Sequence, residues 1–391
     1  MRRRVGLILA IAVVGCLVVA TFAIASGTRS GRPAPSEVLK PAAALAYEPA
    51  AGATGVNPTA PVSVHVSSGT FADVALRDAE GKAVEGTMSD DRTRWTASQP
   101  LSYAQRYTWS GTATGENGNS APLEGSFETV TPARQLRSVL NIGDGRTVGV
   151  AAPIEIQFDG HVEDRAAVEH ALSVETSTPV EGAWGWLPDE NGGSRIHYRT
   201  KEYWPANTKV TVTAKLFGVD YGGGSYGRAD VSSSFTIGRA QIVKADANSH
   251  RLVVMRDGKQ VANYPASYGL GSDPDRNTRS GIHVVTEKFT DKRMVSQQFD
   301  YDVMMKWAVR VSNNGEFIHA NPATTGVQGS SNVTHGCVNL SLGNAKAYYD
   351  SALYGDPVEV TGTPVQLSAR DGDIWDWTLS WEQWKGLSAL D

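Results

Sequence analysis

The chain has 391 residues, which is enough for roughly two to four domains. Its formal net charge is −5 and no basic block follows residue 4, which argues against a nucleic-acid-binding protein. Forty glycines and many short runs rich in Val, Thr and Ser indicate a fold that is mainly β.

Residues 1–26 are interpreted as a signal peptide or a membrane anchor. Three arginines precede an uncharged apolar run, and Ala23-Ile24-Ala25 fits a signal-peptidase site. The run of about 21 residues is also long enough to cross a bilayer. Lipidation at Cys16 is a third alternative, against which the apolar residues after it argue. All three alternatives export the body to the cell wall or periplasmic space. A retained segment would hold it at the outer face of the cytoplasmic membrane.

Residues 27–46, rich in Ser, Gly, Pro, Arg and Ala, are expected to form a flexible linker. Residues 47–133 and 134–239 each contain short alternating runs separated by Gly, Pro, Asp and Asn, which predicts two β-sandwich domains. The two segments look like a diverged repeat, since residues 55–64 match residues 149–156 in pattern. No Cys…Trp…Cys framework of the antibody type is present.

Residues 240–363 are predicted to form a third, β-rich domain, and residues 364–391 a Trp-rich extension. Asp257-Gly258 marks a hairpin turn, Ser341 caps a helix over residues 342–353, and residues 357–360 form a strand. The tryptophans of the extension allow two interpretations: a platform for sugar rings, or an apolar staple that docks the tail on neighbouring domains. A capping box from Ser380 to Gln383 favours the staple.

The chemistry of the chain centres on Thr334-His335-Gly336-Cys337-Val338-Asn339. Cys337 is the only cysteine outside residues 1–26, and an unpaired cysteine in an exported protein suggests a reactive thiol. A free thiol has a pKa of about 8.5 and needs a base to react at neutral pH. His319 ends a strand-like run upstream and can supply that base. A buried, inert cysteine is the alternative.

A zinc site formed by His319, His335 and Cys337 is a weaker alternative, because the sequence has neither a second nearby cysteine nor an H-x-x-x-H spacing. The remaining histidines that precede residue 240 lack partners at metal-ligand spacing. They are expected to be ordinary surface or strand residues: His65, His161, His170 and His197.

A histidine followed after about fifteen residues by Ser/Thr-His-Gly-Cys, a hydrophobic residue and Asn resembles the signature of the L,D-transpeptidases of the YkuD family. The two preceding segments resemble the tandem immunoglobulin-like domains of the actinobacterial members. This resemblance implies a mainly β protein with two immunoglobulin-like β-sandwich domains, a YkuD catalytic domain and a short Trp-rich C-terminal extension.

The resemblance also implies a reaction. Cys337 would attack the third residue of a peptidoglycan tetrapeptide stem and release D-alanine. The amine of diaminopimelate in a second stem would then resolve the thioester, giving a 3→3 cross-link. No cofactor and no metal are implied, and β-lactams of the carbapenem class would be inhibitors.

Residue roles follow from the same resemblance. His319 would be the general base, oriented by the carbonyl of Ala320. The backbone of Gly336 and Cys337 would hold the oxyanion, together with His335 and Tyr301. Substrate would be bound by the following residues: Tyr301, Asn314, Gly315, Thr334 and Asn339. Residues 294–306 would form a lid. Arg279 stands where many relatives have proline in Thr-Pro-x-Gly.

Two other functions stay open. An L,D-carboxypeptidase or endopeptidase would use the same Cys/His site with water as the acceptor. A non-catalytic wall-binding protein could use the two β domains for adhesion, although binding alone needs no thiol.

Overall fold

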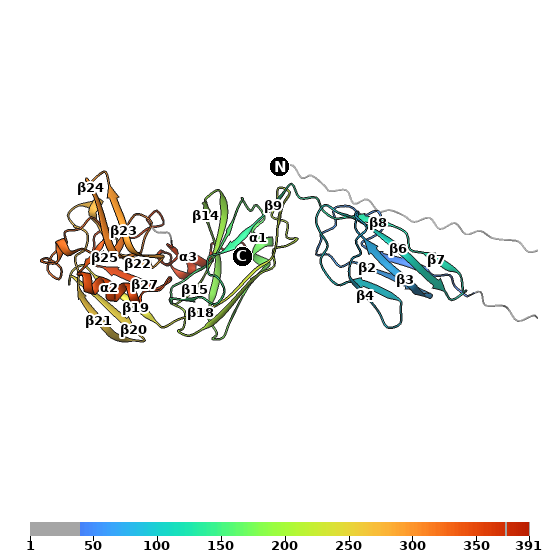
Figure 1. Ribbon diagram of the computed structural model, residues 1–391, viewed down its shortest axis with the longest axis horizontal. Helices are drawn as coiled ribbons and strands as arrows, with labels where there is room; N and C mark the ends of the chain where they lie inside the picture. The colour runs from blue at the N-terminus through green and yellow to red at the C-terminus, as the bar shows by residue number, and fades with distance from the viewer. Residues whose placement is uncertain (1–39, 372–373, 391) are drawn as a thin grey trace, which may run out of the picture.

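A computed structural model describes residues 40–371 and 374–390 of the chain. The predicted signal or anchor, Cys16 and most of the predicted linker lie outside the described residues. Within those ranges, no helix has the length and apolar character needed to cross a membrane. Three β-rich domains follow one another along the long axis of the molecule (Figure 1).

The first domain is a sandwich of two sheets. One sheet has the spatial order β1 (Ala44–Glu48), β2 (Ser63–Ser67), β5 (Arg94–Ala97) and β4 (Gly86–Met88). The other contains β3 (Gly69–Arg77), β6 (Arg106–Gly115) and β7 (Ser120–Pro122), with β8 (Ser126–Glu128) also paired to β6. β1 begins before the predicted domain boundary at residue 47, because Leu45 and Tyr47 pack on the core of this domain and pair with β2.

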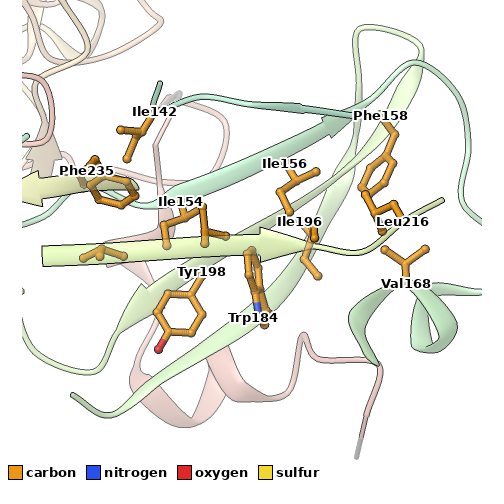
Figure 2. Close-up of a cluster of buried hydrophobic side chains, with 14 of the residues drawn as sticks. Ile142, Ile154, Ile156, Phe158, Val168, Trp184, Ile196, Tyr198, Leu216 and Phe235 are labelled. Atoms are coloured by element: carbon orange, nitrogen blue, oxygen red, sulfur yellow. The ribbon is translucent and has the colours of Figure 1, made fainter. Parts of the chain in front are cut away.

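The second domain is also a sandwich. One sheet has the order β10 (Ser138–Leu140), β12 (Ile154–Phe158), β15 (Gly193–Thr200) and β14 (Gly182–Glu190). The other has the order β11 (Thr147–Val148), β18 (Val231–Ile237), β16 (Lys209–Ala214) and β13 (Leu172–Thr176). β9 (Arg134–Leu136) pairs with β17 (Ser225–Gly227), and α1 spans Arg165–His170. Figure 2 shows the apolar core that alternate residues of these strands build, including Ile154, Ile156 and Ile196.

The third domain consists of two sheets and one principal helix. The larger sheet has the order β21 (Lys259–Pro265), β20 (Arg251–Arg256), β19 (Gln241–Asp246), β27 (Pro357–Thr361) and β22 (Gly281–Val284). The smaller has the order β23 (Glu287–Ser296), β24 (Tyr301–Arg310), β25 (Phe317–Ala320) and β26 (Val338–Leu340). Short 3-10 turns lie at Pro274–Arg276 and Pro322–Thr324.

Three local predictions in this domain are confirmed. Asp257 and Gly258 both have positive φ, as the predicted tight hairpin turn requires. Helix α2 spans Leu342–Ser351, and the side chain of Ser341 caps its first turn by accepting from the N–H of Asn344. The predicted closing strand is β27.

The Trp-rich tail docks on the second domain, as the staple interpretation predicts. Helix α3 (Trp381–Lys385) contacts β14 (Figure 1). Its predicted capping box is present. Trp384 is fully buried and its indole N–H donates to the carbonyl of Ala183, with 2.9 Å between Nε1 and O. A 3-10 turn at Asp376–Thr378 precedes α3. The tail therefore belongs to the core of the protein.

Two buried charged side chains of the second domain hold this tail. The guanidinium of Arg199 lies 4.8 Å from the ring centre of Trp377 and 5.1 Å from that of Trp384. His197 Nδ1 lies 3.0 Å from a carboxylate oxygen of Asp376, and both side chains are buried. His197 lies in strand β15, as expected of a strand histidine, and its ion-pair partner lies far away in the sequence.

Candidate active site

Strand pairing brings the two sequence motifs together. β25 and β26 run parallel, with His319 opposite Asn339. Cys337 directly precedes β26. The histidine and the cysteine motif therefore lie at neighbouring positions of one sheet, although the loop between them contains more than a dozen residues.

A cavity of about 230 Å³ lies over this part of the sheet. It is lined by Met294, Tyr301, Val303, Met305, His319, Asn321, Thr324, Val333, Thr334, His335, Cys337 and Asn339. Six of the residues predicted for the site are in this set: Tyr301, His319, Thr334, His335, Cys337 and Asn339. Asn314 and Gly315, predicted to line the donor site, are not among the lining residues, and Gly315 contacts the thiol through its carbonyl instead.

His319 is buried and held in one orientation. Its Nδ1 atom lies 2.9 Å from the carbonyl oxygen of Ala320, the orienting contact that the resemblance implies. This contact requires a proton on Nδ1 in the neutral ring, which leaves Nε2 free to accept one. Burial lowers the pKa of His319 to about 4, although the hydrogen bond to Ala320 acts in the opposite direction. The imidazole is therefore a neutral base at pH 7.

The thiol of Cys337 is also neutral at pH 7. Burial raises its pKa to about 12, the backbone N–H of Phe317 lowers it, and the charge of Glu316 raises it further. The Sγ atom lies 3.5 Å from the carbonyl oxygen of Gly315, to which the thiol donates. Neutral thiol and neutral imidazole indicate proton transfer during attack, without a preformed thiolate–imidazolium pair.

The loop before Cys337 is fixed by two threonine hydroxyls. Thr334 Oγ1 donates to the carbonyl of Cys337 (2.6 Å) and accepts from the N–H of Gly336 (3.3 Å). Thr278 Oγ1 donates to the carbonyl of Gly336 (2.7 Å). Gly336 has φ +116°, a conformation that residues with a side chain rarely adopt. These contacts orient the peptides that the resemblance assigns to the oxyanion.

Residues 240–360 match the family model described as L,D-transpeptidase catalytic domain (YkuD), and residues 53–220 match the model described as bacterial Ig domain. L,D-transpeptidase 5 of Mycobacterium tuberculosis (strain ATCC 25618 / H37Rv) is 52% identical over 351 residues, which cover 90% of this chain and 78% of that protein. The chain belongs to the L,D-transpeptidase family. L,D-transpeptidase 2 of Mycobacterium tuberculosis (strain CDC 1551 / Oshkosh) is 37% identical to this L,D-transpeptidase, over 86% of this chain and 83% of that protein.

A solved LD transpeptidase structure in complex with imipenem is 30% identical to this L,D-transpeptidase, with a TM-score of 0.49. The match between the two covers 59% of this chain and 100% of the solved chain. The predicted family, enzyme class and fold class are confirmed: this L,D-transpeptidase combines bacterial Ig domains with a YkuD domain. The individual roles of the site residues stay predictions.

The hairpin of β23 and β24 borders the cavity of this L,D-transpeptidase, in the region where the resemblance implies a lid. Tyr301, Val303 and Met305 alternate along β24 and face the cavity. Val303 and Met305 lie within the predicted lid, residues 294–306, but were not named as site residues, although their alternation with Tyr301 could have indicated them. The ring of His335 lies 5.6 Å from Tyr301 and 4.5 Å from Phe299, centre to centre. His335 therefore joins the motif to the lid.

Asn339 of the transpeptidase presents an unpaired acceptor. Its side chain is buried and its Nδ2 atom donates to Thr324 Oγ1 (3.3 Å). Its Oδ1 atom has no hydrogen-bond partner among the described residues. A buried amide oxygen without a partner is costly, which makes it a natural acceptor for a substrate N–H. In the described ranges, no group of three or more His, Cys, Asp or Glu side chains is placed to hold a metal ion, including the three residues of the zinc alternative.

Proposed function

We propose that this L,D-transpeptidase cross-links peptidoglycan stems through a thioester on Cys337. The observation that carries the proposal is the geometry of His319: a neutral imidazole, fixed by Ala320, that lines the same cavity as the only described thiol. A thioester suits the reaction, because an amine cleaves it readily. The donor is a tetrapeptide stem and the acceptor is the side-chain amine of diaminopimelate in another stem.

In the first half-reaction, sulfur bonds to the carbonyl carbon of the third stem residue while His319 takes the thiol proton. The oxyanion is stabilised by the backbone N–H of Cys337, with Gly336, His335 and Tyr301 as further candidates. The intermediate collapses, the bond to the terminal D-alanine breaks, and His319 returns its proton to the leaving amine. D-Alanine leaves and the acyl group stays on sulfur.

In the second half-reaction, the acceptor amine attacks the thioester carbonyl and His319 removes its proton. The bond between carbon and sulfur breaks, and the proton returns to Cys337. Asn339 and Thr334 line the cavity beside the reacting groups and support substrate binding. Asn339 contributes the unpaired amide oxygen described above.

The lid favours transfer to an amine over hydrolysis. Met294, Val303 and Met305 contribute apolar side chains to the cavity lining, and apolar side chains around the thioester reduce its access to water. A carboxypeptidase or endopeptidase would need water at this position. The apolar lining therefore supports the transpeptidase over the hydrolase.

A product assay tests the proposal. The protein from residue 40 onward is incubated with a disaccharide-tetrapeptide, and the products are read by mass. A cross-linked dimer supports the transpeptidase, and tripeptide without dimer identifies a carboxypeptidase. Unchanged substrate contradicts both. The Cys337→Ala variant is the control and should give no product.

We propose further that the body is exported to the cell wall or periplasmic space, with residues 1–26 as its signal or anchor. Carbapenems are proposed inhibitors, since a strained β-lactam carbonyl can acylate the same thiol. N-terminal sequencing of the protein from a membrane fraction and from a wall fraction distinguishes a retained segment from a cleaved one.

A further inference from the structure

The loop that joins β24 to β25, residues 311–316, contacts the sulfur of Cys337 through its backbone. Gly315 accepts from the thiol, and the N–H of Phe317, directly after the loop, donates to the sulfur. A carbonyl acceptor stabilises the protonated thiol, whereas an N–H donor stabilises the thiolate. The position of this loop therefore affects both forms of the nucleophile.

Glu316 anchors the loop through a carboxylate that is 3% exposed. Its Oε1 atom accepts from the backbone N–H of Arg279 (3.1 Å) and lies 3.3 Å from the Nη1 atom of the same residue. Its Oε2 atom accepts from the hydroxyl of Ser312 (2.9 Å). A buried carboxylate needs such partners, because an isolated charge in an apolar interior is very costly. The loop conformation therefore depends on Arg279.

The side chain of Glu316 also lies against the peptide that precedes the nucleophile. A Cβ atom at Gly336 would lie 3.5 Å from Cγ of Glu316 and 3.3 Å from the carbonyl oxygen of Asn277. The first distance corresponds to ordinary van der Waals contact and the second to tight contact. Glu316 therefore borders the space beside Gly336, next to the nucleophile.

Arg279 is itself held from a second side. Its Nε atom lies 2.8 Å from a carboxylate oxygen of Asp371, in the C-terminal tail. The amide oxygen of Asn314, when it faces the guanidinium, lies 2.6 Å from Nη1. Two carboxylates and a loop amide thus fix Arg279. The tail that docks on the second domain reaches the active-site loop through this contact.

The charged and titratable groups facing Glu316 are Arg279, His283 and the Cys337 thiol, and Asp371 faces Arg279. His283 Nδ1 lies 3.9 Å from Oε2 of Glu316. We propose that Glu316 and Arg279 are positioning residues for acylation, which hold the loop 311–316 so that Gly315 and Phe317 stay against the sulfur of Cys337. The consequence for acylation rests on the proposed function, whereas the effect on the thiol does not.

The test compares Glu316→Gln, Arg279→Met and Arg279→Lys with the wild type. The rate of thiol alkylation by iodoacetamide, compared between variants at mildly alkaline pH, reports shifts in the pKa of Cys337 without any substrate, because the rate follows the thiolate fraction. Arg279→Met should raise that pKa, because the carboxylate of Glu316 loses its guanidinium partner. Glu316→Gln should lower it, because the carboxylate itself is gone. Arg279→Lys keeps the positive charge and should stay near the wild type.

Acylation by a tetrapeptide donor is measured beside the titration. Arg279→Met should acylate about a hundredfold more slowly, the scale of loss that a 1 Å misplacement of a reacting group produces. Arg279→Lys should recover part of the rate. Arg106→Met, which removes an exposed ion pair with Glu128 in the first domain, is the matched control and should change neither readout.

A purely structural role predicts lower melting temperatures with an unchanged thiol titration. Folded Glu316→Gln and Arg279→Met proteins that titrate like the wild type, or that shift in the same direction, would overturn the inference. If Arg279→Met does not fold, Glu316→Gln decides alone, because an unchanged or raised thiol pKa in that variant would overturn the inference. A wild type that fails to acylate would refute the proposed function, and the alkylation data would still decide this inference.

Discussion

The Nδ1 atom of His319 donates to the carbonyl oxygen of the next residue, Ala320, across 2.9 Å. A backbone carbonyl thus orients the imidazole, and no carboxylate is needed to do so. A carboxylate partner would raise the pKa of the ring, whereas here burial lowers it to about 4. The base is therefore neutral and ready to accept a proton over a wide range of pH.

Replacement of His319 should remove the base without removing the thiol. His319→Gln should slow acylation by at least about a hundredfold, the usual scale of general-base help. His335→Gln should slow acylation less than His319→Gln does, because His335 is exposed and contacts mainly the lid residues Phe299 and Tyr301. Stopped-flow acylation by a tetrapeptide donor measures both variants. A greater loss in the His335 variant would show that the two roles are reversed.

Mild acidification should leave the acylation rate unchanged. His319 must be neutral to act as the base, and its pKa lies near 4, below the ordinary value of about 6.5. The rate should therefore fall only as the pH approaches about 4, provided that the protein stays folded. The check is acylation between pH 4 and 8 beside circular dichroism. A rate that halves near pH 6.5 would contradict the buried, neutral imidazole.

Loss of the tail should destabilise the protein. Trp384 is fully buried against β14 and Trp375 is nearly so. Trp384→Ala should lower the free energy of unfolding by about 3–5 kcal/mol, the usual cost of removing a buried tryptophan side chain. A melting curve measures this, beside a sedimentation assay on purified peptidoglycan. An unchanged melting temperature with lost sedimentation would favour the platform interpretation.

The ion pair of His197 with Asp376 should make tail docking depend on pH. Burial lowers the pKa of His197, but Asp376 and Glu155 outweigh burial, so that the pKa lies above its ordinary value. The stabilisation is thus fully present below about pH 6.5, the unfolded value, and is lost as the pH rises through the folded value. The melting-temperature difference between wild type and His197→Gln should be larger at pH 6 than at pH 9. A difference that grows with pH would contradict the assigned shift.

The residues that the sequence revealed are those whose partners lie nearby or in a known motif. Ser341, Asp257 and Ser380 act on their own turn or helix, and a local pattern was enough to predict them. The residues around Cys337 form a known motif, and this motif was enough to predict several of the residues that line the cavity near the thiol. The ion pairs of His197 and Arg279 were not predicted, because their partners are distant in sequence and only the folded chain brings the charges together: Asp376, Glu316 and Asp371.

A fragment without the second domain should lose contacts that the C-terminal tail and the third domain make with it. A fragment that begins near Ala240 exposes the faces of Trp375 and Trp384 that pack on the second domain. It also lacks Arg239, whose guanidinium pairs with the buried carboxylate of Asp356 at the domain junction. A fragment that begins near Arg134 retains these contacts and should acylate like the full body. Intact-protein mass after incubation with imipenem compares the two fragments.

In the proposed function, Cys337 carries the acyl group as a thioester between the two half-reactions. The most direct measurement is the mass of the protein, and of its proteolytic peptides, after rapid acid quenching with a tetrapeptide donor. We expect an added tripeptide acyl group on the peptide that contains Cys337, and no adduct in the Cys337→Ala or Cys337→Ser variants. An acyl group mapped to another residue, or cross-linked product formed by the Cys337→Ala variant, would contradict it.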